Sequence, residues 1–201
     1  MAYLKKSLLN ATLLSVFLAA PLVSAEEAPT AEVPENSVIS DGKLTKEELA
    51  QYAVIGQRQV VYLTEKATDE YSDELADAKP NMPGAWMLLD DGKTVKRINL
   101  DSQAGDAPAQ VRILMYRAAL KSIARRGKIN AAAILYTGKV NEDSDKEALV
   151  IEHEHRLGIS GNKVIPFEVK NGKVYYSEPV TSKKPFQMFY DNKSEALANQ
   201  G

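Results

Sequence analysis

Apolar residues recur at helical spacing in the stretch that follows Thr45. The stripe consists of Leu49, Ala53, Gly56, Val60, Leu63 and Ala67. Positions three or four residues apart share one face of a helix, so this stripe predicts a helix buried along one side. Thr45 and Glu48 fit a capping box at its start, and Pro80 ends the polar run that follows it. The apolar surface is widened by Tyr52, Ile55, Val61 and Tyr62. We therefore expect this helix to be covered on two sides or to pack against a partner.

Two further elements are predicted between residues 85 and 126. The apolar arms on either side of Asp91-Gly92 indicate a β-hairpin with a two-residue turn. A second helix is predicted with Asp106 as its N-cap and Pro108 in its first turn. It runs to about Arg126, and Gly127 follows it as a residue typical of helix C-termini. We expect its small-residue face to pack on a sheet. That face consists of Val111, Leu114, Met115, Ala118, Ala119 and Ser122.

The second half of the chain has the patterns of β-strands. Residues 129–140 are apolar at both parities, which predicts a strand covered on both faces or central in the sheet. Residues 147–157 alternate, and one face carries Leu149, Ile151, His153, His155 and Leu157. The opposite face carries Ala148, Val150, Glu152, Glu154 and Arg156. We expect Glu152, Glu154 and Arg156 to form a polar patch on the outside. A turn is predicted over residues 158–161.

The clearest turn of the chain is Asn171-Gly172, the strongest short-range signal for a hairpin. A two-residue loop there places Val169 across from Val174 and Phe167 across from Tyr176. Pro166 favours an edge position or a bulge, because it cannot donate to a sheet ladder. The aromatic stretch 183–190 should dock on the domain, and residues 192–201 should fray.

These elements predict an α+β fold with two main helices packed on an antiparallel sheet of about five or six strands. The expected order is α-β-β-α-β-β-β-β, within a single domain that spans residues 41–191. This order resembles the layout of roadblock and profilin-like domains. The resemblance concerns layout alone, and it implies no activity.

The N-terminus has the pattern of a secretory signal. Lys5 and Lys6 precede an apolar run, and Val23-Ser24-Ala25 fits a cleavage site, so residues 1–25 are predicted to be removed. Residues 26–40 are acidic and carry Pro29 and Pro34, which predicts a disordered linker. No other stretch is long and apolar enough to span a bilayer. The expected product is a periplasmic protein with no stable membrane insertion.

The net charge and the cysteine content argue against two properties: nonspecific nucleic-acid binding and stabilisation by disulfides. The whole chain has a formal net charge of −2, and removal of the two signal lysines leaves −4. A mildly acidic chain is not built for nonspecific nucleic-acid binding. The sequence contains no cysteine, so no disulfide can stabilise the fold in an oxidising compartment.

Two groups of residues are candidates for chemistry. His153 and His155 point the same way on one strand and could bind a divalent metal, if a third ligand came from elsewhere. The alternatives are that both close the polar end of a core face, or that they contact a ligand or substrate. Arg117, Lys121 and Arg125 form a basic ridge on the second helix. That ridge is either an anion or ligand site or a solvated outer face.

No nucleophile elbow, phosphate loop, dinucleotide fingerprint or cysteine nucleophile is present in the sequence. We therefore favour a non-enzymatic binding or protein-interaction module without a cofactor, with an unknown protein or a second copy as partner. The alternative is a small metal-binding protein or metalloenzyme that uses His153 and His155.

Overall fold

The structure is a computed structural model that describes residues 45–77, 82–100, 107–140 and 146–190. The predicted signal, the acidic linker and the frayed tail lie outside these residues. The two helices are α1 (Lys46–Ala76) and α3 (Ala109–Ala124). The strands are β1 (Gly84–Leu89), β2 (Val95–Ile98), β3 (Ile129–Lys139), β4 (Glu147–His155), β5 (Ile159–Lys170), β6 (Lys173–Tyr176) and β7 (Val180–Lys183). No helix in these ranges is long and apolar enough to cross a membrane.

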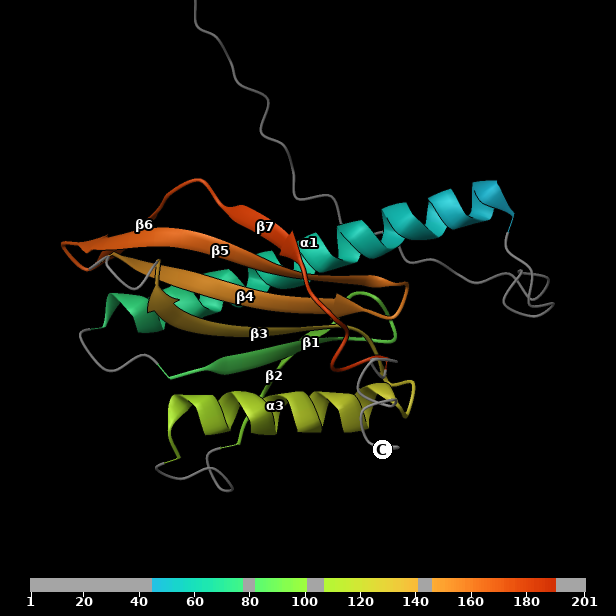
Figure 1. Ribbon diagram of the computed structural model, residues 1–201, viewed down its shortest axis with the longest axis horizontal. Coiled ribbons are helices and arrows are strands. Elements are labelled where there is room, and N and C mark those ends of the chain that lie inside the picture. Colours follow the sequence, from blue (N-terminus) through green and yellow to red (C-terminus); the bar gives the residue numbers. More distant parts are fainter. Residues whose placement is uncertain (1–44, 78–81, 101–106, 141–145, 191–201) are drawn as a thin grey trace, which may run out of the picture.

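The strands form one antiparallel sheet in the order β2-β1-β3-β4-β5-β6, with β7 paired to β5. The predicted α+β fold is confirmed. The sheet also contains β7, a short strand that precedes the stretch expected only to dock. The two helices lie on opposite faces of the sheet, so the strands form a middle layer (Figure 1).

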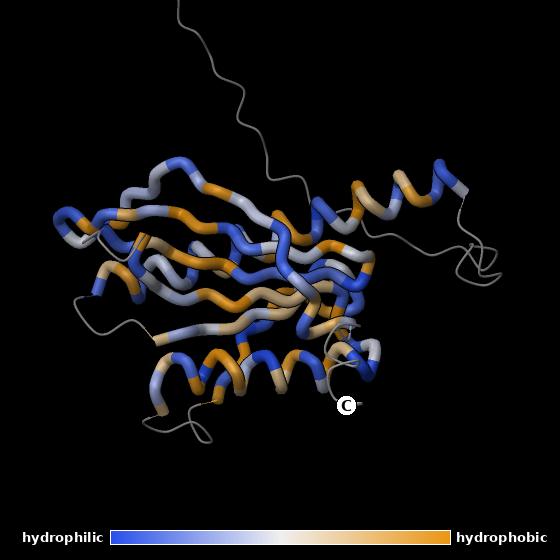
Figure 2. Tube along the Cα trace, viewed as in Figure 1, coloured by the Kyte–Doolittle hydropathy of each residue, from blue (hydrophilic) through white to orange (hydrophobic). Residues whose placement is uncertain are grey.

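Both faces of the sheet carry an apolar core. On the α1 side, buried residues such as Leu63, Tyr71, Trp86 and Ile151 form one cluster. On the α3 side, Tyr116, Leu120, Ile134 and Met188 belong to a second. Strand β3 contributes alternate residues to both clusters, as its apolar sequence at both parities predicted. Hydrophobic and hydrophilic positions alternate along both helices (Figure 2).

Helix α1 begins at the predicted capping box. The Glu48 N–H donates to the Thr45 hydroxyl at 3.2 Å, and the Thr45 N–H donates to the Glu48 carboxylate at 3.0 Å. The predicted stripe is buried from Gly56 to Ala67 and extends to Leu75, because the polar run continues as helix. The N-terminal part of α1 extends past the end of the sheet (Figure 1).

The buried face of α3 differs from the one expected. Arg112, Tyr116 and Leu120 are buried, whereas Leu114 is 60% and Val111 is 44% exposed. The sheet beneath α3 presents small residues such as Ala85 and Ala132. Large side chains from the helix are therefore needed to fill the space between the layers at native density. The prediction that the small-residue face of α3 packs on the sheet is wrong, because the sheet already supplies the small side chains.

The Asn171-Gly172 turn is confirmed, with φ angles of 53° and 69° and the predicted pairs of β5 and β6 across it. The β1–β2 connection is longer than the two-residue turn expected. The Leu89 N–H donates to the Thr94 carbonyl, and the Asp91 carboxylate accepts from the N–H groups of Lys93 and Thr94. Asp91 thus organises a wider loop instead of occupying a tight turn.

Strand β5 has two partners along its outer edge. Residues 161–164 pair with β7, and residues 167–170 pair with β6. Pro166 lies where the partner changes, and its carbonyl accepts from the Ser177 N–H on that edge. The predicted edge position is wrong, because β5 has β4 on one side and β6 and β7 on the other. Pro166 is accommodated at the gap between its two outer partners. Gly161 lies within β5, so the turn before this strand is shorter than the predicted 158–161 segment.

Candidate functional site

Strand β4 places two carboxylates beneath α3 and the chain's last described residues. Glu152 and Glu154 face the α3 side and the two histidines face the α1 side, as the alternation predicted. The expected outer polar patch, however, is wrong. Glu152 is only 3% exposed and Glu154 is fully buried, because α3 and the C-terminal segment (residues 184–190) bind over this face.

Glu152 is held by a cation and a phenol. The Arg117 Nε–H donates to Glu152 Oε2 at 3.0 Å, and the Arg117 Nη2–H donates to Oε1. The Tyr136 hydroxyl also donates to Oε1, at 3.0 Å. The bond to Glu152 raises the pKa of Arg117, and burial raises the pKa of Tyr136 well above its usual value. Arg117 of the predicted basic ridge therefore binds a carboxylate of this chain, that of Glu152.

Glu154 anchors the C-terminal segment to the sheet. Its Oε1 accepts from Lys184 Nζ at 2.6 Å and from the Gln187 N–H at 2.7 Å. Its Oε2 accepts from the N–H groups of Met188 and Phe189 at 2.9 and 3.0 Å. The expected docking of this segment thus depends on one buried carboxylate as well as on apolar contact.

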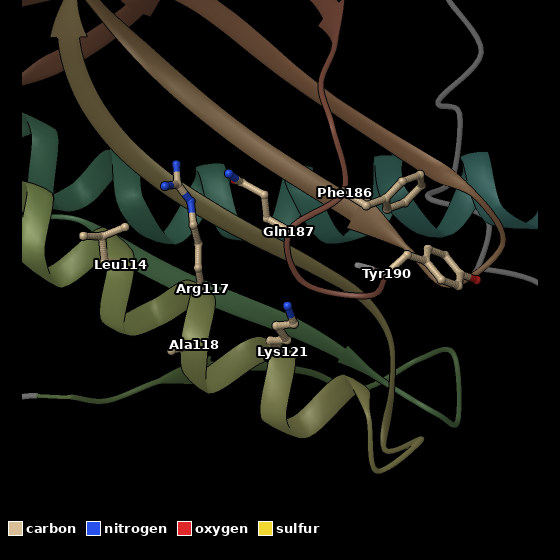
Figure 3. A pocket seen from close by; sticks show the side chains of 7 residues that line it. All are labelled: Leu114, Arg117, Ala118, Lys121, Phe186, Gln187 and Tyr190. Atoms are coloured by element: carbon tan, nitrogen blue, oxygen red, sulfur yellow. The ribbon is translucent and has the colours of Figure 1, made fainter. Parts of the chain in front are cut away.

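An open cavity of about 220 Å³ lies between α3 and the C-terminal segment (Figure 3). Its lining consists of Leu114, Arg117, Ala118, Lys121, Phe186, Gln187 and Tyr190. The structure therefore brings two of the three predicted ridge cations, Arg117 and Lys121, to one cavity. Arg125 does not line it, because it lies exposed at the C-terminal cap of α3.

His155 is a buried structural residue. Its Nε2 lies 2.8 Å from Gln59 Oε1, and its Nδ1 accepts from the Leu157 N–H at 3.0 Å. These partners define a neutral ring with the proton on Nε2. Burial lowers the pKa of His155 to about 4. Both ring nitrogens are thus engaged within the fold.

His153 packs closely against β5. It is 8% exposed, and its Nε2 lies 3.0 Å from the point where a Cβ on Gly161 would stand. Its Nδ1 has no hydrogen-bond partner among the residues that the structure describes. Burial lowers the pKa of His153. Within the described ranges, no three His, Cys, Asp or Glu side chains are grouped to hold a metal ion. The metal hypothesis therefore gains no support from this pair.

A second surface is the projecting end of α1 (residues 46–54), which precedes Gly56, the first buried residue of the helix. The helix extends past the sheet at this end (Figure 1). Leu49 is 57% and Val54 is 51% exposed, and Ala53 is exposed as well. Leu49 and Ala53 continue the stripe that Gly56 and Val60 bury against the sheet. No described residue covers this continuation.

Sequence reasoning missed three groups of the α3 side: Tyr136, Lys184 and Gln187. Their types are common on surfaces, and no local pattern linked them to β4. The alternation that placed Glu152 and Glu154 on one face was the available signal. Comparisons with protein-family models, with curated proteins and with solved structures found no match.

Proposed function

We propose that this chain is a non-enzymatic protein-interaction module of the periplasm, which self-associates through the projecting end of α1. The observation that carries the proposal is the apolar stripe that runs past the sheet, with Leu49 more than half exposed. The compartment is predicted from residues 1–25, which lie outside the described residues.

The buried carboxylates of the candidate site are already bound by other groups of the fold. This supports a role other than catalysis. Glu152 is bound by Arg117 and Tyr136, and Glu154 by Lys184 and three backbone N–H groups. A general acid or base must reach a substrate proton at hydrogen-bond distance. Carboxylates with this many internal donors are better suited to fixing elements together.

A second copy is the partner that fits the stripe best. Antiparallel packing of two projecting ends would cover the same residues in both copies with one two-fold interface. Large side chains (Leu49 and Tyr52) alternate with small ones (Ala50 and Ala53), and small residues let helices approach closely. The contact spans only a few turns, below the size of a standard interface of about 1,600 Å². We therefore expect a weak dimer, with a dissociation constant on the order of micromolar or higher.

Sedimentation equilibrium of the chain without its signal tests this proposal. The wild type should show a concentration-dependent dimer between about 10 and 500 μM. Leu49→Glu should be monomeric over that range, because it would bury an unpaired charge in the interface. The matched control is Gln51→Glu, an equal charge change on an exposed position of the same segment but off the stripe. A monomeric wild type, or equal association of both variants, would refute the proposal.

A further inference from the structure

We propose that the cavity between α3 and the C-terminal segment binds a carboxylate carried on an apolar group about the size of one amino-acid residue. The site lies on the sheet face opposite α1, so it is independent of the proposed dimer surface. Its donors and its apolar walls come from the same two elements.

Arg117 presents a fixed hydrogen-bonding edge to this cavity. Its Nε and Nη2 are held by Glu152, whose side chain is 4% exposed. Nη1 makes no hydrogen bond to any described residue, although the Arg117 side chain is 25% exposed and lines the cavity. A guanidinium has two edges that match a carboxylate. Glu152 occupies one edge and orients the other for a second anion.

The Gln187 amide and the charge of Lys121 lie beside the same space. Gln187 Oε1 accepts from Lys184 Nζ at 3.5 Å, which leaves the amide N–H₂ group to face the cavity. Figure 3 shows that amide directed toward the Arg117 side, with the Lys121 side chain rising from α3 toward the C-terminal segment. Lys121 brings a further positive charge to the lining. The open edge of Arg117 and the Gln187 amide can donate to the two oxygens of a carboxylate, and the charge of Lys121 attracts it further.

The rest of the lining is apolar and defines the other end of the ligand. Leu114 and Ala118 lie on α3, and Leu114 is 60% exposed. On the other side, the Phe186 and Tyr190 rings meet edge to face, with centroids 5.0 Å apart. The volume of about 220 Å³ is below the range of about 300–1,000 Å³ typical of pockets for drug-sized ligands. The ligand is therefore either a small free acid or the C-terminal residue of a polypeptide.

Titration calorimetry with defined probes tests the site. We expect N-acetyl-leucine, or a tetrapeptide that ends in leucine with a free carboxylate, to bind with a submillimolar dissociation constant. The same tetrapeptide with a C-terminal amide should bind at least about tenfold more weakly, because it lacks the charge. Tighter binding of the acid tetrapeptide than of N-acetyl-leucine identifies a polypeptide end as the source, and equal binding identifies a free acid.

Matched variants locate the binding. Lys121→Gln should weaken the acid probes about tenfold. Lys128→Gln, the same change at an exposed position outside the lining, should alter the affinity less than twofold. Absence of binding at roughly 10 mM of both acids, equal affinity for acid and amide, or equal effects of the two variants would overturn the proposal. None of these outcomes depends on the oligomeric state.

Discussion

Glu154 shows how one residue can fix the position of a distant segment. Its carboxylate is fully buried and accepts four hydrogen bonds from residues 184–189. A buried carboxylate is tolerated only when it is paired and hydrogen-bonded in this way. The alternation along β4 predicted the face on which Glu154 lies. Its burial could not be predicted, because it depends on a segment thirty residues away in the chain.

Glu154→Gln should destabilise the fold. The substitution leaves Lys184, whose side chain is 7% exposed, without its carboxylate. Losing one partner of a buried pair costs about 3 kcal/mol. Urea unfolding measures the loss. The matched control is Glu168→Gln, which removes an ion pair to Lys170 whose side chains are both more than half exposed. That control should leave the unfolding free energy almost unchanged. Equal stabilities of the two variants would contradict the anchoring role.

His155 should make stability depend on pH. Its folded pKa of about 4 lies below the unfolded value of 6.5, so the unfolded state takes up the proton first as the pH falls. Its contribution to stability is complete above pH 6.5 and is lost between pH 6.5 and 4. We expect the unfolding free energy to fall by about 2 kcal/mol from pH 7 to pH 5 through this residue. His155→Gln should remove that part of the slope in urea titrations. An unchanged slope would show that His155 does not titrate as described.

At the scale of elements, short sequence motifs that form only one local structure could be predicted. The capping box at Thr45 and the turn at Asn171-Gly172 formed as expected, because each satisfies its own backbone locally. The face of α3 was not predictable in the same way. Two apolar stripes compete on that helix, and the size of the side chains on the facing strands decides between them.

Gly161 should be required for the docking of β7. A Cβ there would stand 3.0 Å from both the Ser182 carbonyl oxygen and His153 Nε2. Gly161→Ala should therefore lower the unfolding free energy by about 1–3 kcal/mol and increase amide exchange in β7. Gly138→Ala, in β3, is the control, since nothing lies within 4 Å of its added Cβ. If the Gly161 variant is as stable and as protected as the control, the close approach of β7 is wrong.

For the whole molecule, the order of the layers could be predicted from the apolar content of the strands. The exposed surfaces and the function could not. The apolar run at both parities placed β3 between two layers, and the structure agrees. The point at which α1 extends past the sheet depends on the lengths and twist of several strands. No local sequence pattern encodes these. The candidate cavity likewise depends on which side chains of α3 face outward. Arg117 and Lys121 were recognisable as a ridge, but their apolar neighbours across the cavity were not.

The absence of cysteine from the sequence permits a direct test of the proposed self-association. Single-cysteine variants Leu49→Cys and Gln51→Cys place one thiol on the apolar stripe or off it, within the same segment. Treatment with a short bis-maleimide at about 100 μM protein, analysed by denaturing electrophoresis, reports which position faces a second copy. The proposed dimer predicts efficient linkage at position 49 and little at position 51. Equal linkage at both positions, or none at position 49, would contradict it.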